Sequence, residues 1–214
     1  MISRRIEQLR REYSGEELKE SKVNADPLKQ FEIWFEEAVE AEVADPHAMV
    51  LATASPDGGP SARVVLLRGI DPEGFTFYTN YGSRKAQEIL SGSRAAVVFY
   101  WHELDRQVRA EGDVTKGEDA DSDRYFASRP RASQIAAWAS NQSGVISGRK
   151  DLDERYKEFA GKFKGQRIPR PDNWGGFKLH PKSVEFWQGR PKRLHDRIIY
   201  VLNGSSWDIR RLAP

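Results

Sequence analysis

The segment from residue 184 to residue 197 combines side chains whose types and spacing suit the binding of a planar anion. A pair of aromatic residues is followed by a turn signal and then by Arg193, His195 and Arg197 at alternate positions. If this second half is a strand, its two-residue repeat places those three side chains on one face. Two guanidinium groups around an imidazole suit a planar, anionic ligand better than a hydrophobic core. The alternative is a solvated strand face on which Asp196 forms salt bridges.

A second candidate site lies where a strand that includes Thr79 is expected to lead into a helix after Ser83. The first turn of a helix offers unpaired N–H groups and the positive end of the helix dipole. Arg84 and Lys85 would fall in this turn, where basic residues are normally unfavourable. A bound phosphate would explain them. The alternative is a charge pair tolerated on the surface.

A third candidate is the set Tyr125, Arg129 and Ser133, which recur at intervals of four residues. If the backbone stays roughly helical past Pro130, the three side chains share a face. Two hydroxyls and a guanidinium group can then bind one phosphate. A solvated helix junction around Arg129, Pro130 and Arg131 explains the same residues.

Weaker signals come from two strands and a loop. Arg63 and Arg68 flank an apolar run, and in an ideal strand they face opposite sides, which predicts two different contacts or a bulge. An ordinary buried strand with arginines at its exposed ends is the alternative. The amide and hydroxyl groups of Gln142, Ser143 and Gln107 could bond to the edge of a heterocycle.

The composition narrows the class of protein. The chain has 214 residues, of which 38% are hydrophobic and 31% charged, as expected for a globular protein. A net charge of +2 and the absence of dense basic runs argue against a nucleic-acid binder. The lack of cysteine excludes disulfides and thiol chemistry, and four widely spaced histidines predict no metal site. Without a signal sequence or a long apolar segment, the protein is expected to be cytoplasmic.

Strands are expected to outnumber helices. Asp26-Pro27 predicts the start of a helix that ends at Asp45-Pro46. Further helices are expected at 83–90, 119–128, 130–139 and 152–163. Strands are expected at 49–53, 62–67, 75–79, 95–100, 107–114, 176–179, 183–188, 197–202 and 207–211. Closely spaced strands with turn signals predict a barrel or a sandwich, and the lack of a GxGxxG motif argues against a Rossmann fold.

The domain organisation is expected to be simple. Residues 1–25 are highly charged and predict a mobile N-terminal arm with a short helix, or else a disordered tail. Residues 26–214 are expected to form a single domain. Helices around 118–164 would then be an insertion in one β structure.

These segments, in this order, resemble the pyridoxine/pyridoxamine 5′-phosphate oxidase family over nearly the whole chain. The most specific element is Glu185-Phe186-Trp187 followed by Arg193-Leu194-His195-Asp196-Arg197. The other matching segments are Arg10-Arg11-Glu12-Tyr13, Asp26-Pro27, Arg63–Leu67, Phe77-Tyr78-Thr79-Asn80, Gly82-Ser83-Arg84-Lys85, Tyr125-Phe126, Ser128-Arg129-Pro130, Trp174-Gly175-Gly176 and Arg211-Leu212-Ala213-Pro214.

The resemblance implies a mainly β, α+β fold: an FMN-binding split β-barrel, antiparallel and Greek-key-like, with flanking helices. It implies a homodimer with FMN at the interface. It also implies the oxidation of pyridoxamine 5′-phosphate or pyridoxine 5′-phosphate by O2 to pyridoxal 5′-phosphate, in vitamin B6 biosynthesis and salvage. Hydrogen peroxide is released, together with ammonia from the amine. Another split-barrel flavin oxidoreductase and a non-catalytic flavin or pyridoxal-phosphate binder are the alternatives.

The resemblance also implies roles for individual residues. The implied FMN contacts are Arg63, Val64, Val65, Leu66, Leu67, Arg68, Tyr78, Thr79, Arg84, Lys85, Gln107, Gln142, Ser143, Trp187 and Arg197. The implied substrate contacts are Arg10, Arg11, Glu12, Tyr13, Arg68, Tyr125, Arg129, Ser133, Arg193, Leu194 and His195. Arg193 and His195 would be the catalytic pair flanking the substrate ring, and Arg10 and Tyr13 would belong to an arm that closes over it. Arg68 departs from the family's usual lysine, and its planar fork makes the exchange a change of contact geometry.

Overall fold

The computed structural model describes residue 6 and residues 11–214. Within this part the chain forms two compact units. We call the first the terminal unit: it contains both ends of the chain, namely residues up to 49 with 97–111 and 181–214. The second, the central unit, consists of residues 50–96 and 112–180. The single domain over 26–214 stays a prediction.

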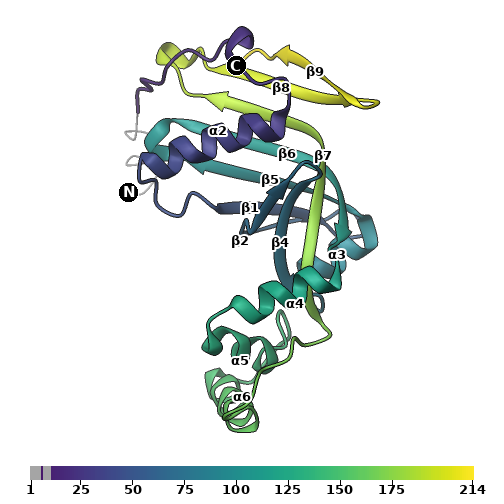
Figure 1. The fold of residues 1–214 in the computed structure, drawn as a ribbon. Helices are drawn as coiled ribbons and strands as arrows, with labels where there is room; N and C mark the ends of the chain where they lie inside the picture. Colours follow the sequence, from purple (N-terminus) through teal and green to yellow (C-terminus); the bar gives the residue numbers. More distant parts are fainter. Residues whose placement is uncertain (1–5, 7–10) are drawn as a thin grey trace. The chain divides into compact units, whose positions relative to one another are not determined.

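The β structure is one nine-stranded sheet in which the printed pairings are antiparallel (Figure 1). Its strands are β1 (Ala48–Ala54), β2 (Pro60–Leu66), β3 (Gly69–Asp71), β4 (Gly74–Asn80), β5 (Arg94–Trp101), β6 (Arg106–Lys116), β7 (Trp174–Gln188), β8 (Asp196–Asn203) and β9 (Ser206–Arg211). The hydrogen-bonded order is β2-β1-β5-β6-β7-β4-β3, and β8 pairs with both β7 and β9. This confirms the mainly β, antiparallel fold with flanking helices.

Two details of the sheet differ from the sequence-based expectation. β3 was not expected, and β7 is continuous where two strands were expected. Pro181 suggested the break. It lies between the stretch of β7 that pairs with β4, which ends at Leu179, and the stretch that pairs with β8, which starts at Ser183. Neither of these ladders needs the N–H group that proline lacks.

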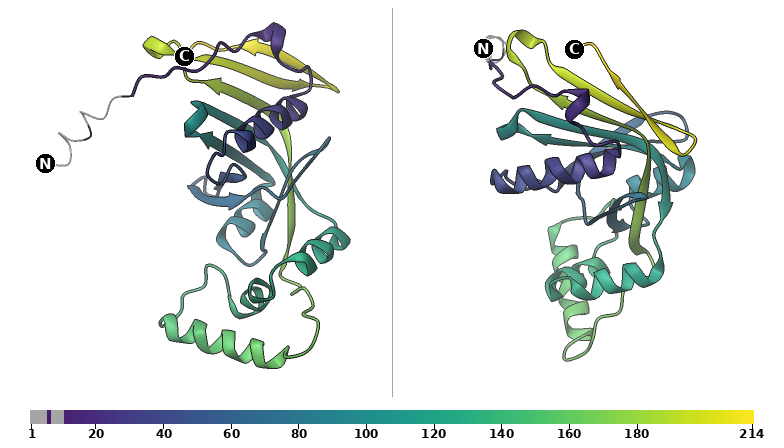
Figure 2. Two further views of the ribbon diagram at one scale, coloured as in Figure 1. Left: turned by 60° about the vertical axis from the view of Figure 1, so that its left-hand side comes forward. Right: turned by 45° about the horizontal axis from the view of Figure 1, so that its top comes forward.

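The terminal unit is built around helix α2 (Pro27–Glu40), which lies against β5 and β6 in Figure 1. The helix begins where the sequence predicts, because the Asp26 carboxylate accepts a hydrogen bond of 2.8 Å from the backbone N–H of Leu28. Its buried face contacts the sheet through aromatic rings, as in the pair Phe31 and Phe99 with centroids 4.8 Å apart. The β8–β9 hairpin completes this unit, as both views of Figure 2 show.

The central unit contains the remaining α-helices, and the break predicted at Pro130 is confirmed. The helices are α3 (Arg84–Gly92), α4 (Asp119–Ser128), α5 (Arg131–Ala139) and α6 (Arg149–Lys162). α5 and α6 pack against each other. A small core of Phe126, Ile135, Phe163, Ile168 and Trp174 holds these helices to the start of β7. Short 3-10 helices occur at Glu20–Lys22, His102–Leu104 and Pro191–Arg193.

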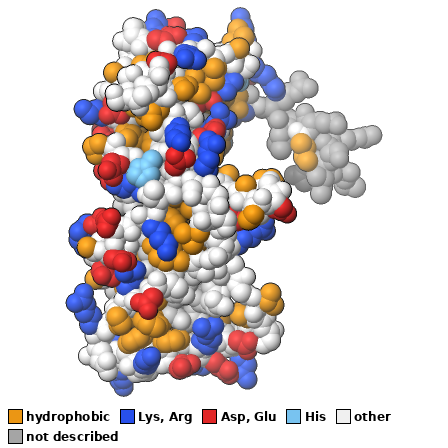
Figure 3. Space-filling view, turned by 90° about the vertical axis from the view of Figure 1, so that its right-hand side faces the viewer, with side chains coloured by type: hydrophobic (Ala, Val, Ile, Leu, Met, Phe, Trp, Pro, Cys, Tyr) orange, Lys and Arg blue, Asp and Glu red, His pale blue; other side chains and the backbone are white. Residues whose placement is uncertain are grey.

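The surface agrees with the balanced charge of the sequence. On the face shown in Figure 3, basic and acidic side chains are interspersed. Among the described residues, no helix is long and apolar enough to cross a membrane. The same residues contain no group of acidic, histidine or cysteine side chains arranged to hold a metal ion.

Candidate functional site

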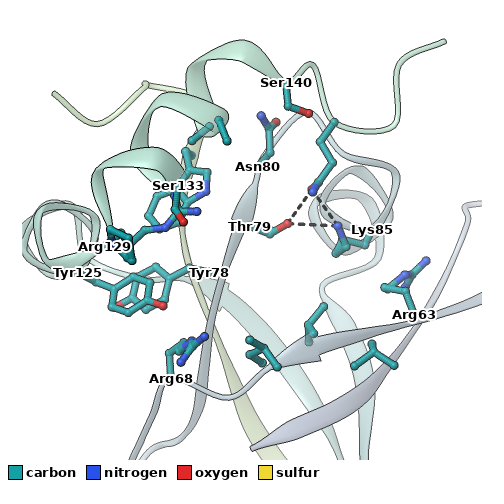
Figure 4. A pocket seen from close by; sticks show the side chains of 18 residues that line it. Arg63, Arg68, Tyr78, Thr79, Asn80, Lys85, Tyr125, Arg129, Ser133 and Ser140 are labelled. Atoms are coloured by element: carbon teal, nitrogen blue, oxygen red, sulfur yellow. Dashed lines mark hydrogen bonds between the residues drawn. The ribbon is translucent and has the colours of Figure 1, made fainter. Parts of the chain in front are cut away.

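A cavity of about 680 Å³ in the central unit brings together most of the residues expected to bind phosphates (Figure 4). Its volume lies in the usual range for small-molecule sites. The expected site residues that line it are Arg63, Val64, Val65, Leu66, Arg68, Tyr78, Thr79, Lys85, Tyr125, Arg129, Ser133 and Gln142. Two independent sequence hypotheses, the phosphate site at Lys85 and the set around Arg129, therefore converge on one cavity.

The lining of this cavity is strongly cationic. Arg63, Arg68, Lys85 and Arg129 contribute to it, and no acidic residue is among the described lining residues. Nη1 of Arg129 is buried and has no hydrogen-bond partner in the described part of the chain. Burial lowers the pKa of Arg129, and the nearby Arg68 lowers it further. Unpaired buried donors and mutually repelling cations are what an anionic ligand would relieve.

Arg63 and Arg68 reach the same cavity, so the predicted division of the two between opposite faces is wrong. The argument assumed that one strand carries both residues. β2 ends at Leu66, and the backbone beyond it no longer follows the two-residue repeat.

The residues around Arg129 meet in the cavity for a reason other than a continuous helix. Arg129 itself has an extended backbone, with φ −69° and ψ 148°, at the end of α4. Tyr125 precedes this break and Ser133 follows it, on α5. The two helix ends nevertheless bring all three side chains to the cavity wall, as Figure 4 shows.

A cluster of aromatic rings supports this wall. The rings of Tyr78, Tyr125 and Trp174 are nearly parallel, with centroids 4.0 Å apart for the two tyrosines and 5.5 Å apart for Tyr78 and Trp174. The guanidinium carbon of Arg129 lies 4.7 Å from the Trp174 ring centroid. A Cβ atom at Gly176 would come within 3.0 Å of the Tyr78 ring, so glycine there allows the stacking.

The opposite side of the cavity is held by a polar network. Nζ of Lys85 lies 3.2 Å from Oγ1 of Thr79 and 3.0 Å from Oε1 of Gln142, and Figure 4 shows these contacts as dashed lines. Burial lowers the pKa of Lys85. The backbone N–H of Arg84, at the start of α3, donates to Oγ of Ser143 at 3.2 Å. Arg84, Ser143 and the buried Leu67 border this region without lining the cavity.

A second cluster of expected site residues lies in the terminal unit. The rings of Tyr13, Trp187 and His195 are in mutual contact, with centroid distances of 5.6 Å for Tyr13 to Trp187, 5.0 Å for Tyr13 to His195 and 4.7 Å for Trp187 to His195. Nδ1 of His195 accepts a hydrogen bond of 3.1 Å from the backbone N–H of Arg190. Burial and then the charge of Arg193 lower the pKa of His195. The imidazole is therefore neutral, with its proton on Nε2.

The one-face arrangement of Arg193, His195 and Arg197 is wrong. β8 begins only at Asp196, and residues 191–193 form a 3-10 turn in which Arg193 has a φ of +60°. Arg193 is exposed, whereas Arg197 is held by the buried Glu185, with distances of 2.7 and 3.1 Å to its two oxygens. The turn signal that precedes these residues extends further than expected.

The remaining expected contacts are in the terminal unit or beyond the described residues. Arg10 lies outside the described residues. Arg11 forms an ion pair of 2.6 Å with Asp105, and Glu12 and Leu194 are exposed. Gln107 lies on β6 within the terminal unit. The mobility of the arm remains a prediction.

Several residues of the cavity were missed by the sequence analysis. Asn80, Ser140 and Trp174 line it, and Glu88 on α3 binds the side chains of Arg63 and Arg84. Trp174 stands in the Trp-Gly-Gly segment that carried part of the resemblance, so a signal for it was present. Glu88 had none, because a single acidic residue in a helix is usually solvated.

The antiparallel sheet, its flanking helices and this cavity define a split-barrel protein. Residues 35–188 match the family model described as pyridoxamine 5′-phosphate oxidase. Residues 174–214 match a second model, the pyridoxine 5′-phosphate oxidase C-terminal dimerisation region. The chain belongs to the pyridoxamine 5′-phosphate oxidase family, whose members are oxidoreductases.

Individual relatives agree with this assignment. A protein from Cyanothece sp. named pyridoxine/pyridoxamine 5′-phosphate oxidase is 50% identical over 209 residues, which are 98% of each chain. One of the same name from Acaryochloris marina is 53% identical and covers 98% of this chain and 95% of its own. The crystal structure of PhzG from Burkholderia lata, in complex with tetrahydrophenazine-1-carboxylic acid, superposes with a TM-score of 0.89 at 30% identity, over 94% of this chain and all of that one.

A more distant structure shows the fold alone. The pyridoxamine 5′-phosphate oxidase-related, FMN-binding protein from Nostoc punctiforme has a TM-score of 0.69 at 19% identity, over 86% of this chain and 97% of that one. The split-barrel prediction is thereby confirmed.

Proposed function

We propose that the protein oxidises pyridoxamine 5′-phosphate and pyridoxine 5′-phosphate to pyridoxal 5′-phosphate, with FMN as its cofactor and O2 as the final acceptor. The observation that carries the proposal is the cationic cavity, which is free of acidic lining residues and holds the unpaired Nη1 of Arg129. Phosphorylated substrates and a phosphorylated cofactor are the ligands that such a lining suits. The names of the relatives supply the reaction.

FMN fits the donor set of the cavity. Lys85, with Arg84 and Arg63 beside it, supplies cations for a phosphate at the start of α3. Thr79 and Gln142 supply polar groups for the edge of a heterocycle, and they already form a network with Lys85. Bound FMN would supply the redox chemistry, since it accepts a hydride equivalent from the substrate and passes electrons to O2.

The substrate phosphate is assigned to Tyr125, Arg129 and Ser133, with Arg68 assisting. Nη1 of Arg129 would gain the partner that it lacks in the described chain. A charge-assisted hydrogen bond of this kind is about twice as strong as a neutral one. Binding energy obtained at the phosphate, away from the reacting carbon, can be used to align the ring.

Arg193 and His195 are assigned to the orientation of the substrate ring. The proton on Nε2 makes neutral His195 a hydrogen-bond donor toward an oxygen substituent. Trp187, in ring contact with His195, and Arg197 are assigned to the cofactor. Arg10 and Tyr13 would belong to an arm that covers the substrate and excludes water.

We further propose a homodimer with FMN at its interface. The match of residues 174–214 to a dimerisation region supports the assembly. In this proposal residues 26–214 act as one FMN-binding domain, and the arm of residues 1–25 changes its order when the substrate binds.

The test begins with the absorption spectrum of the purified protein, which should show a bound flavin. Addition of pyridoxamine 5′-phosphate without oxygen should bleach this spectrum, and air should restore it with formation of pyridoxal 5′-phosphate, hydrogen peroxide and ammonia. A flavin that is not bleached, or a reaction in air without aldehyde product, would refute the proposal. Reduction by a nicotinamide cofactor instead would indicate another split-barrel oxidoreductase, and flavin binding without turnover would indicate a carrier.

A further inference from the structure

Glu88 is a buried carboxylate at the centre of a network that the proposed reaction does not use. It lies on α3, and only 5% of the residue is exposed. Oε2 accepts hydrogen bonds from the hydroxyls of Thr53 at 2.5 Å and Ser61 at 2.6 Å. These hydrogen bonds and the one from Arg84 hold the pKa of Glu88 at about 2, so the carboxylate is ionised at neutral pH.

The same carboxylate joins two cations that come from different elements. Oε1 accepts from Nε of Arg84 at 2.8 Å, and Oε2 lies 3.4 Å from Nη2 of Arg63. Arg84 belongs to α3 and Arg63 to β2. A single side chain of Glu88 therefore fixes the positions of two guanidinium groups relative to each other.

The contacts leave the two arginines with different free donors. The Nη1 and Nη2 groups of Arg63 are bound by the carbonyl of Leu51, the hydroxyls of Thr53 and Ser61, and Glu88. Arg84 is held through Nε, and its terminal nitrogens form no hydrogen bond within the described chain. The Arg84 fork is thus anchored at its base and open at its tip, which is the geometry for binding a phosphate.

Electrostatics gives a second reason for an anion at this position. Arg63, Arg84 and the half-buried Lys85 lie close together, and the charge of Arg63 adds to burial in lowering the pKa of Lys85. A buried carboxylate between the two arginines offsets their repulsion, while the group keeps a net positive charge for a ligand.

We propose that Glu88 is a positioning residue for the cofactor phosphate and acts through Arg84 and Arg63. The proposal rests on the proposed function, because it takes FMN as the ligand. Glu88 touches neither the cavity lining nor the reacting atoms. Its loss should therefore weaken the binding of the phosphate end of the cofactor and leave the binding of the ring unchanged.

The experiment compares FMN with riboflavin, which has the same ring and no phosphate. Dissociation constants for both are measured by flavin fluorescence quenching, on wild-type protein and on Glu88→Gln, after removal of bound flavin. Glu88→Gln should weaken FMN binding about 10- to 100-fold, as expected when charge-assisted hydrogen bonds are lost. Riboflavin binding should stay within about twofold, since it makes no phosphate contact.

Controls separate positioning from folding. Glu158→Gln makes the same chemical change at an exposed position of α6 and should alter neither constant. Glu88→Asp keeps the charge on a shorter side chain and serves if Glu88→Gln does not fold. It should weaken FMN several-fold and spare riboflavin. In an Arg84→Gln background, the effect of Glu88→Gln on FMN should shrink, because the two residues act together.

The outcomes are distinct. Equal losses for FMN and riboflavin, or no loss for FMN, would overturn the positioning role while the proposed function stands. Wild-type protein that binds neither flavin would overturn both.

Discussion

The cavity of the central unit and the β7–β8 pair of the terminal unit both present arginines, but they hold them in opposite states. Arg197 on β8 is bound by both oxygens of the buried Glu185, and this contact raises the pKa of Arg197. Arg129 in the cavity has a buried nitrogen without a partner, and burial lowers the pKa of Arg129. Sequence alone does not distinguish these two arginines.

The difference indicates which arginine supports the fold and which awaits a ligand. A paired charge in the interior contributes little net stability, but removal of one partner leaves the other exposed to the full cost of burial. An unpaired buried donor costs stability until a ligand binds it. Arg197 therefore supports the strand pair whatever else it contacts, and Arg129 is maintained at a cost that only binding offsets.

The largest expected effect is on substrate binding at Arg129. Replacement by glutamine removes the charge and leaves the fold intact, because no protein partner loses its contact. We expect KM for pyridoxamine 5′-phosphate to rise about 100-fold and the melting temperature to stay the same or increase. Steady-state kinetics and calorimetry on one preparation check both. A lower melting temperature with unchanged KM would reverse the comparison.

Arg197→Ala should show the opposite pattern, with stability as the main loss. Glu185 would keep only Arg109 as a partner, at 2.9 Å, so we expect a loss of about 2 kcal/mol in the free energy of unfolding. Urea denaturation measures it. Arg210→Ala on the neighbouring strand, where the arginine and Asp208 are both exposed or half-exposed, is the matched control and should have little effect. Equal losses in the two variants would contradict the supporting role of Arg197.

Sequence was sufficient for the elements with strong local signals. Asp26-Pro27 marked the start of α2, and Pro130 marked the break between α4 and α5, because caps and prolines act within a few residues. The strands were also located well, apart from the short β3 and the continuity of β7. That continuity depends on which partner strand needs a hydrogen bond at Pro181, and a single sequence does not state the pairing.

The candidate site was predictable in part. Lys85 and Arg129 were found because helix termini and four-residue spacing have direct chemical meaning. Face arguments failed at Arg68 and at Arg193, since both residues lie just outside the strands on which the argument placed them. Glu88 was missed because its importance comes from Thr53, Ser61 and the arginines, which fold around it from distant positions.

A smaller effect is expected at Trp174, which supports Arg129 through its ring. Trp174→Leu removes the cation–π contact, worth about 1 kcal/mol at a half-buried site, and should raise KM roughly fivefold with kcat nearly unchanged. Trp174→Phe keeps a ring and should restore most of the affinity. Measurement of KM and kcat for both variants decides this. A fall in kcat alone would show that the tryptophan acts elsewhere.

The smallest effect is expected at His195. Burial is the main cause of its lowered pKa, and the charge of Arg193 is the second. Arg193→Gln removes a positive charge that disfavours the protonated imidazole, so the pKa of His195 should rise part of the way toward its ordinary value. NMR titration of the imidazole carbons measures the shift. A pKa that falls, or does not move, would remove Arg193 from the surroundings of His195.

The central claim is that Arg129 is unpaired because it awaits a phosphate. The most direct test is the pair of dissociation constants for pyridoxal 5′-phosphate and pyridoxal, measured by the change in flavin absorbance, in wild type and Arg129→Gln. The account predicts that the substitution weakens pyridoxal 5′-phosphate about 100-fold and leaves pyridoxal unchanged. Equal weakening of both ligands, or of neither, would contradict it.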